Sequence, residues 1–206
     1  LEGNNNDLAE LRGKFEAHSY LWLTDLETYF KEFCEDAVTH TELASYLDLD
    51  KFDEAITKYE SVKSMISKLE SPTDIGWLRV NTQPIKHQLV TYSSRWIEMF
   101  SAHLKAHLMT KLETFEGFMT QVSAGLDTEV PTEGGKEPLM EVMADIRDVR
   151  KAMDITEEMF EPLRKCNALL KKHQVDIEGS TIAGKPVLDY LEEAPMTWDG
   201  LVKKTF

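Results

Sequence analysis

The chain has 206 residues, of which 42% are hydrophobic and 29% charged, so it can bury a core in one large domain or two small ones and is not a disordered tail. Its net charge of −14 is uneven: residues 1–70 carry −9, residues 71–125 carry +1 and residues 126–206 carry −6. An acidic chain of this kind argues against nucleic-acid binding, and its short apolar runs are insufficient to cross a membrane.

The apolar residues of 7–37 recur at every third or fourth position, which predicts an amphipathic helix. This seam consists of Leu8, Leu11, Phe15, His18, Trp22, Leu26, Tyr29 and Phe33. Residues 50–70 repeat the pattern and predict a second helix, with Asp50 as its N-cap and Pro72 beyond its end. We expect this helical pair to form an N-terminal domain of residues 1–71.

The segment after the helical pair contains the strongest strand candidate, IGWLRV at residues 75–80. This stretch is short and lacks an evident partner, so no sheet is expected. From residue 84 to 123 a helical seam resumes, and Pro84 is acceptable in the first turn of a helix. The seam consists of Ile85, Leu89, Tyr92, Trp96, Met99 or Phe100, Leu104, Leu108, Leu112, Phe115, Met119 and Val122. A helix of about 40 residues is roughly 60 Å long.

Residues 124–138, AGLDTEVPTEGGKEP, are predicted to form a loop because of their glycine and proline content. A third long helix follows at about 137–173, with Pro162 in its middle. A proline inside a helix removes a backbone donor and costs about 3 kcal/mol. The apolar pattern nevertheless keeps its phase across this position, from Phe160 to Leu163. We therefore expect a kink in one helix and not a helix boundary.

A last helix is expected to begin near Met196 and to run into the C-terminus. Because the chain stops within a helical pattern and starts with neither Met nor a signal-peptide pattern, we expect it to be a piece of a longer protein. Such long helices predict an all-α fold, an elongated bundle of long antiparallel helices that is spectrin-like or coiled-coil-like. Residues 72–206 would form its second domain.

One stretch approaches a nucleotide-binding motif. In GSTIAGKP, residues 179–186, the positions of Gly179, Gly184 and Lys185 match the phosphate-binding loop G-x-x-x-x-G-K-[ST]. Pro186 stands where a hydroxyl must hold Mg²⁺, and it has no backbone N–H for the phosphate. We therefore expect a flexible loop and no cofactor.

Metal and thiol chemistry have weak signals as well. His103 and His107 share one helix face at a spacing that can hold Zn²⁺, but no further ligand is placed beside them, so an ordinary helix face is expected. Cys34 and Cys166 lie far apart in helical patterns, which favours reduced thiols and a cytosolic protein. No catalytic, cofactor-binding or metal residues are therefore assigned, and this chain is not expected to be an enzyme.

The four tryptophans are the most informative remaining residues. Trp22 and Trp96 lie on apolar seams, which predicts core positions. Trp77 and Trp198 lie at helix junctions, where a large ring can wedge helices together. A partner-binding anchor is the alternative role for these two.

Three stretches together resemble the dynein heavy chains, in particular the axonemal ones: IGWLRVNTQPIKHQL (75–89), TEEMFEPLRKCNALL (156–170) and YLEEAPMTWDGLVKK (190–204). HSYLWLTDLETYF (18–30) is similar to the aromatic helix just upstream in that family. The matching region is the end of the tail, where it leads into the linker. The family phrases fall here on the residues that we single out as structural or interaction candidates, namely Gly76, Trp77, Arg79, Trp96, Phe160, Pro162 and Trp198.

The resemblance implies a mechanical role without catalysis in this segment. In that family ATP is hydrolysed by AAA+ modules downstream, the linker swings across their ring, and the tail passes the motion to cargo or doublet microtubule. The implied partners are neighbouring helical bundles and the linker of the same heavy chain, with another heavy chain or intermediate and light chains as further candidates. The implied location is the cytoplasm, the cytoskeleton and the axoneme of the cilium or flagellum.

A second function class stays open beside this one. The same helical pattern suits a spectrin-like or vinculin-like adaptor domain that binds partner helices with no motor attached. AAA+ modules in the same reading frame would favour the motor.

Overall fold

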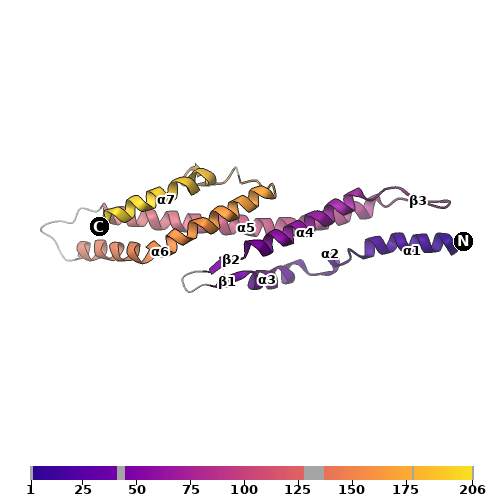
Figure 1. Ribbon diagram of the computed structural model, residues 1–206, viewed down its shortest axis with the longest axis horizontal. Helices are drawn as coiled ribbons and strands as arrows, with labels where there is room; N and C mark the ends of the chain where they lie inside the picture. The colour runs from indigo at the N-terminus through magenta and orange to yellow at the C-terminus, as the bar shows by residue number, and fades with distance from the viewer. Residues whose placement is uncertain (1, 41–44, 128–136, 178, 206) are drawn as a thin grey trace. The chain divides into compact units, whose positions relative to one another are not determined.

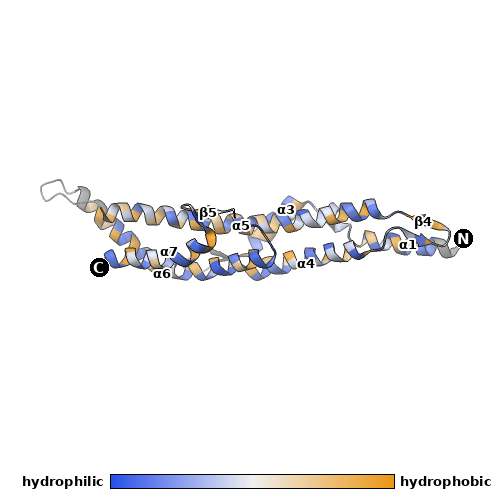
Figure 2. Cartoon of the chain, turned by 90° about the horizontal axis from the view of Figure 1, so that it is seen from above, coloured by the Kyte–Doolittle hydropathy of each residue, from blue (hydrophilic) through white to orange (hydrophobic). Residues whose placement is uncertain are grey.

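The computed structural model describes residues 2–40, 45–127, 137–177 and 179–205. The described residues are 78% helical and the long helices pack against one another, which confirms the predicted all-α class (Figure 1). Hydrophobic and hydrophilic residues alternate along these helices (Figure 2), as expected for helices that bury one face. By their internal contacts the residues divide into two compact units. The domain boundary predicted between residues 71 and 72 stays a prediction.

The first unit comprises Leu1–Thr39 and Leu47–Ala102. It contains α1 (Glu2–Glu16), α2 (Tyr20–Leu23), α3 (Leu26–Asp36), α4 (Leu49–Lys68) and the first part of α5 (Gln83–Leu126). The second unit comprises His40–Tyr46 and His103–Phe206, with the rest of α5, α6 (Glu137–Lys172) and α7 (Val187–Lys204). The boundary between the two units falls within α5, which is one continuous helix of 44 residues.

The prediction of a single helix over residues 7–37 is wrong, because three separate helices, α1, α2 and α3, occupy this part of the chain. Thr24 adopts an extended conformation with ψ of 128°, and Asp25 then caps α3 by accepting a hydrogen bond from the Thr28 amide at 3.2 Å. An earlier break, at residues 17–19 between the end of α1 and the start of α2, separates Trp22 from the helix of the buried Phe15. The side chain of Trp22 is 40% exposed, which corrects the predicted core position.

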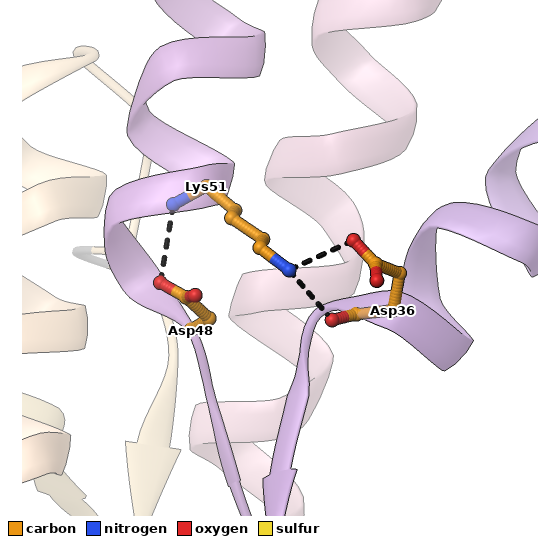
Figure 3. Close-up of polar contacts among 3 residues, drawn as sticks. All are labelled: Asp36, Asp48 and Lys51. Carbon is orange, nitrogen blue, oxygen red and sulfur yellow. Dashed lines mark hydrogen bonds and ion pairs between the residues drawn. The ribbon is translucent and has the colours of Figure 1, made fainter.

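Helix α4 follows its prediction closely, with a different N-cap. Asp48, and not Asp50, caps the helix, because its carboxylate accepts from the Lys51 amide at 3.3 Å. The Lys51 side chain reaches back to the end of α3, where its Nζ lies 2.8 Å from both the carbonyl and the carboxylate oxygen of Asp36 (Figure 3). These contacts join the start of α4 to the end of α3.

Short paired strands occur although no sheet was predicted. The two strands β1 (Val38–His40) and β2 (Ser45–Leu47) pair, and β3 (Thr73–Ile75) pairs antiparallel with β4 (Leu78–Val80). The strand candidate at residues 75–80 is therefore not one strand: it contains the end of β3, the turn at Gly76 with φ of +59°, and β4. A third pair, β5 (Thr181–Ile182) and β6 (Lys185–Pro186), precedes α7. The β3–β4 and β5–β6 pairs are small hairpins between helices.

The two long helices confirm the sequence prediction. α5 buries most of the expected seam from Leu89 to Val122, with Phe100 taking the position left open between Met99 and Phe100. Two predicted seam members differ, because Ile85 is exposed and Tyr92 is half-buried. α6 runs without interruption through Pro162. The start of the loop predicted at residues 124–138 is instead the end of α5, and residues 128–136 of that loop lie outside the described part of the chain.

Helix α7 begins nine residues before the predicted start near Met196. Pro186 occupies its N-cap, and Pro195 lies inside the helix. One face of α7 stays apolar on both sides of Pro195. Its buried residues are Val187, Tyr190, Leu191, Ala194, Trp198, Leu201 and Val202. The packing of this face outweighs the local cost of a proline inside the helix.

Candidate functional site

The described residues contain no group of three or more His, Cys, Asp or Glu side chains that could hold a metal ion. His103 and His107 lie half-buried on α5. Burial, helped by the positive charges of Lys111 and His103, lowers the pKa of His107 to about 4. This imidazole is therefore neutral at pH 7, and it packs against the helices as an uncharged side chain.

The stretch that approaches a phosphate-binding loop forms a hairpin. Ala183 and Gly184 both have positive φ, +50° and +76°, which is the geometry of a type I′ turn between β5 and β6. Lys185 forms an ion pair with Glu193 of α7, and the hydrogen bond to this carboxylate raises the pKa of the Lys185 ammonium. Lys185, the lysine that a bound nucleotide would need, thus pairs with α7 and connects the hairpin to this helix.

The first unit is organised by an aromatic cluster around Trp96, where α5 meets α4 and the N-terminal helices. The buried Trp96 ring stacks on Tyr59 at 4.9 Å between centroids and meets Tyr29 edge-on at 5.2 Å. Its Nε1 donates to the carbonyl of Leu21 at 3.2 Å. Trp96 therefore links three helices and the backbone of a fourth, as its predicted core position required.

The second unit has its own aromatic cluster, in which α5, α6 and α7 meet. Phe115 lies edge-on to Phe160 of α6 at 5.2 Å and to Trp198 of α7 at 5.7 Å. Both partners are buried, at 5% and 4% exposure. Trp198 thus packs between helices, although it lies within α7 and not at the predicted helix junction. Phe160, two residues before Pro162, packs in the same cluster.

A polar contact complements this cluster. The Tyr190 hydroxyl of α7 donates to the carboxylate of Glu116 on α5 at 2.7 Å. Burial and this hydrogen bond raise the pKa of the Tyr190 hydroxyl. Sequence reasoning missed the pair, because residues so far apart in the chain have no spacing that relates them.

The β3–β4 hairpin places three predicted residues at the surface. Arg79 donates from Nε and Nη2 to the two carboxylate oxygens of Asp74, at 2.8 and 3.0 Å, across the strands. Gly76 provides the turn, and Trp77 beside it is 76% exposed. Trp77 therefore does not pack between helices of the described part of the chain. This corrects the predicted role of Trp77 as a wedge between helices.

The predicted residues thus fall into three places that are not brought together. Trp96 lies in the aromatic cluster of the first unit, and Gly76, Trp77 and Arg79 lie in the β3–β4 hairpin of the same unit. Phe160, Pro162 and Trp198 belong to the second unit. Among the described helices, none combines the length and apolarity that a bilayer crossing requires.

No family model matches the chain. Curated proteins do match, and over most of its length. The chain is 34% identical over 178 residues to human dynein axonemal heavy chain 17, which covers 80% of this chain and 4% of that protein. It is 27% identical over 207 residues to the ciliary dynein beta chain of Tripneustes gratilla, covering 94% of this chain and 4% of that protein. It is 26% identical over 230 residues to the flagellar outer arm dynein beta chain of Chlamydomonas reinhardtii, covering 98% of this chain and 5% of that protein.

Proposed function

Because the chain is homologous to axonemal and ciliary dynein heavy chains over most of its length, we propose that it is a non-catalytic segment at the end of the tail, leading into the linker, of such a heavy chain. Its role there is to transmit force between the ATP-driven ring of AAA+ modules and the tail, and to support motor assembly. The chain spans about 4% of the first relatives that it matches. The ATP-driven activity of the whole motor is therefore part of this proposal and is assigned to other parts of the heavy chain.

The observation that carries the proposal is the continuity and cross-bracing of the helices. α5 and α6 run for 44 and 36 residues, and in the second unit the rings of Phe115, Phe160 and Trp198 join three helices at one point. Close-packed interiors have low compressibility and pass strain on. A segment of this construction suits a mechanical element better than a catalytic one.

The proposed partners follow from the same assignment. They are neighbouring helical bundles and the linker of the same heavy chain, with a second heavy chain or intermediate and light chains of a dynein complex as further candidates. The proposed location is the axoneme of a cilium or flagellum. The alternative, an adaptor domain without a motor, is favoured by one observation, the 76% exposure of Trp77 at an ordered hairpin turn.

The test uses a full-length axonemal heavy chain that contains this segment, with Phe160→Ala and Trp198→Ala combined. We expect ATP turnover in solution to be retained and microtubule gliding velocity to fall, because the cross-brace is lost while the ATP sites are untouched. Met196→Ala is the matched control, since Met196 lies two residues from Trp198 and is 79% exposed. Unchanged gliding in the double variant, or an equal loss of ATP turnover, would count against force transmission.

A further inference from the structure

A groove opens in the second unit where α6 ends and α7 begins. Its volume is about 570 Å³, and its apolar lining includes Val175, Ile177 and Leu188. Leu188 is 50% exposed, and the other two are half-buried. Apolar side chains scattered singly over a surface are ordinary, but here they line one concave site.

The backbone that shapes the groove is held in place. Gln174 has a φ of +56°, and the Val175 amide donates back to the carbonyl of Leu170 at 3.0 Å, as in a Schellman motif at a helix end. Lys105 of α5 donates to the carbonyl of Asp176 at 2.7 Å. These bonds fix the turn before any ligand arrives, so little ordering is needed on binding.

A basic ridge borders the groove on the α6 side. Residues 162–175 contain no acidic residue, although the chain as a whole has a net charge of −14. Within them Arg164, Ala168 and Lys171 follow the i, i+4, i+7 spacing that places side chains along one helix face. Among the described residues neither cation of this ridge forms a salt bridge, whereas Lys165 pairs with Glu161. Lys171 itself lines the groove.

We propose that this groove binds an acidic peptide segment of a partner protein. An aliphatic side chain of the peptide enters between Ile177 and Leu188, and its carboxylates face Arg164 and Lys171. Asp176, the acidic residue of the lining, limits how many carboxylates the site accepts. Charge complementarity selects a short peptide over a nucleic acid or an anionic membrane, because the net charge of the chain repels an extended anionic surface.

This inference concerns the surface of the chain itself and does not depend on the heavy-chain assignment. The probe is a fluorescein-labelled peptide of leucines flanked by glutamates, titrated with the 206-residue chain and followed by fluorescence polarisation. We expect saturable binding that weakens with salt, since the carboxylate contacts are exposed. Replacing the peptide's leucines by alanine, or introducing Lys171→Glu or Leu188→Asp in the protein, should weaken binding by about tenfold or more.

Two variants serve as matched controls. Lys31→Glu makes the same charge change on α3, and Met196→Asp makes the same kind of polar change at an exposed site of α7 outside the groove lining. Both should bind the peptide as the unaltered chain does. Circular dichroism checks that each variant is folded, and Lys171 is exposed, so its replacement tests the groove even if Leu188→Asp disturbs α7.

Three results would overturn the proposal. The first is no saturable binding of the leucine–glutamate peptide. The second is equal binding of the alanine–glutamate peptide, of heparin or of phosphatidylserine vesicles, since charge alone would then explain the signal. The third is an equal loss of affinity in the two control variants.

Discussion

His107 shows how burial sets the charge of a single side chain. Its pKa is lowered to about 4 in the folded chain, against about 6.5 for an ordinary histidine. Between these values the unfolded chain binds a proton that the folded chain does not, so stability falls as the pH falls from about 6.5 to about 4. The histidine's contribution to stability is fully present above about pH 6.5.

We expect this loss of stability to be about 1–2 kcal/mol, because the side chain is only partly buried and solvent screens part of the shift. Urea unfolding of the chain and of His107→Gln at pH 7 and pH 5 measures it. The variant should lose less stability than the unaltered chain over this range. His87→Gln, at an exposed position of α5, is the control and should behave as the unaltered chain. An identical pH dependence of all three proteins would contradict the prediction.

The two cysteines differ in reactivity for a similar reason. Cys166 is 2% exposed on α6, and burial raises the pKa of its thiol to about 12. Cys34 is half-buried, and burial raises its pKa as well. Because thiolates are the reactive species, we expect a thiol reagent at pH 8 to label Cys34 first and Cys166 only on unfolding. Mass spectrometry of the labelled peptides decides this, and labelling of native Cys166 at the rate of Cys34 would refute it.

At the scale of elements, the sequence predicted helices well where an apolar seam was long. α5 and α6 were placed to within a few residues, because a long series of regularly spaced apolar positions outweighs any single residue, Pro162 included. The spacing of residues 7–37 was equally regular and misleading. Spacing alone does not register an N-cap, and Asp25 starts a new helix in the middle of the pattern.

The hairpins and the candidate sites were harder to predict. Strands of two or three residues carry no periodicity, and turn residues such as Gly76 and Gly184 fix them. Burial of Trp96 followed from its place on an apolar seam, whereas Trp22, on a similar seam, is exposed. The exposure of Trp77 and the pairing of Tyr190 with Glu116 depend on tertiary placement, which single-sequence patterns do not contain.

Pro162 provides a test at the element scale. Since α6 is continuous through it, Pro162→Ala restores one backbone donor, and intrinsic propensity would favour alanine by up to about 3 kcal/mol. The packing of α6 is fitted to the present course of the helix and opposes that gain. We therefore expect the free energy of unfolding to change by no more than about 1 kcal/mol.

Phe160→Ala should act in the opposite way, because its ring is buried against Phe115. We expect a cost of about 3–5 kcal/mol in the same denaturant measurement. Glu158→Ala, at an exposed position of the same helix, is the control and should stay within about 0.5 kcal/mol. A Phe160→Ala cost below about 1 kcal/mol would mean that the aromatic cluster does not brace the second unit.

The helical construction of the whole molecule suits the proposed mechanical role. Each unit has its own aromatic cluster, and α5 contributes to both units without a break. Helices that are braced by side chains from several elements unfold cooperatively, because losing one contact exposes the others. A segment that carries load in a motor needs this property more than it needs a binding pocket.

The most direct test pulls the 206-residue chain by its two ends in an optical trap. The reference is the stall force of a single full-length axonemal heavy chain, measured in the same instrument. We predict that the chain stays folded at the stall force and unfolds at higher load in discrete steps, with Phe160→Ala lowering the load of at least one step. Gradual extension of the unaltered chain at loads below the stall force would contradict a force-transmitting role.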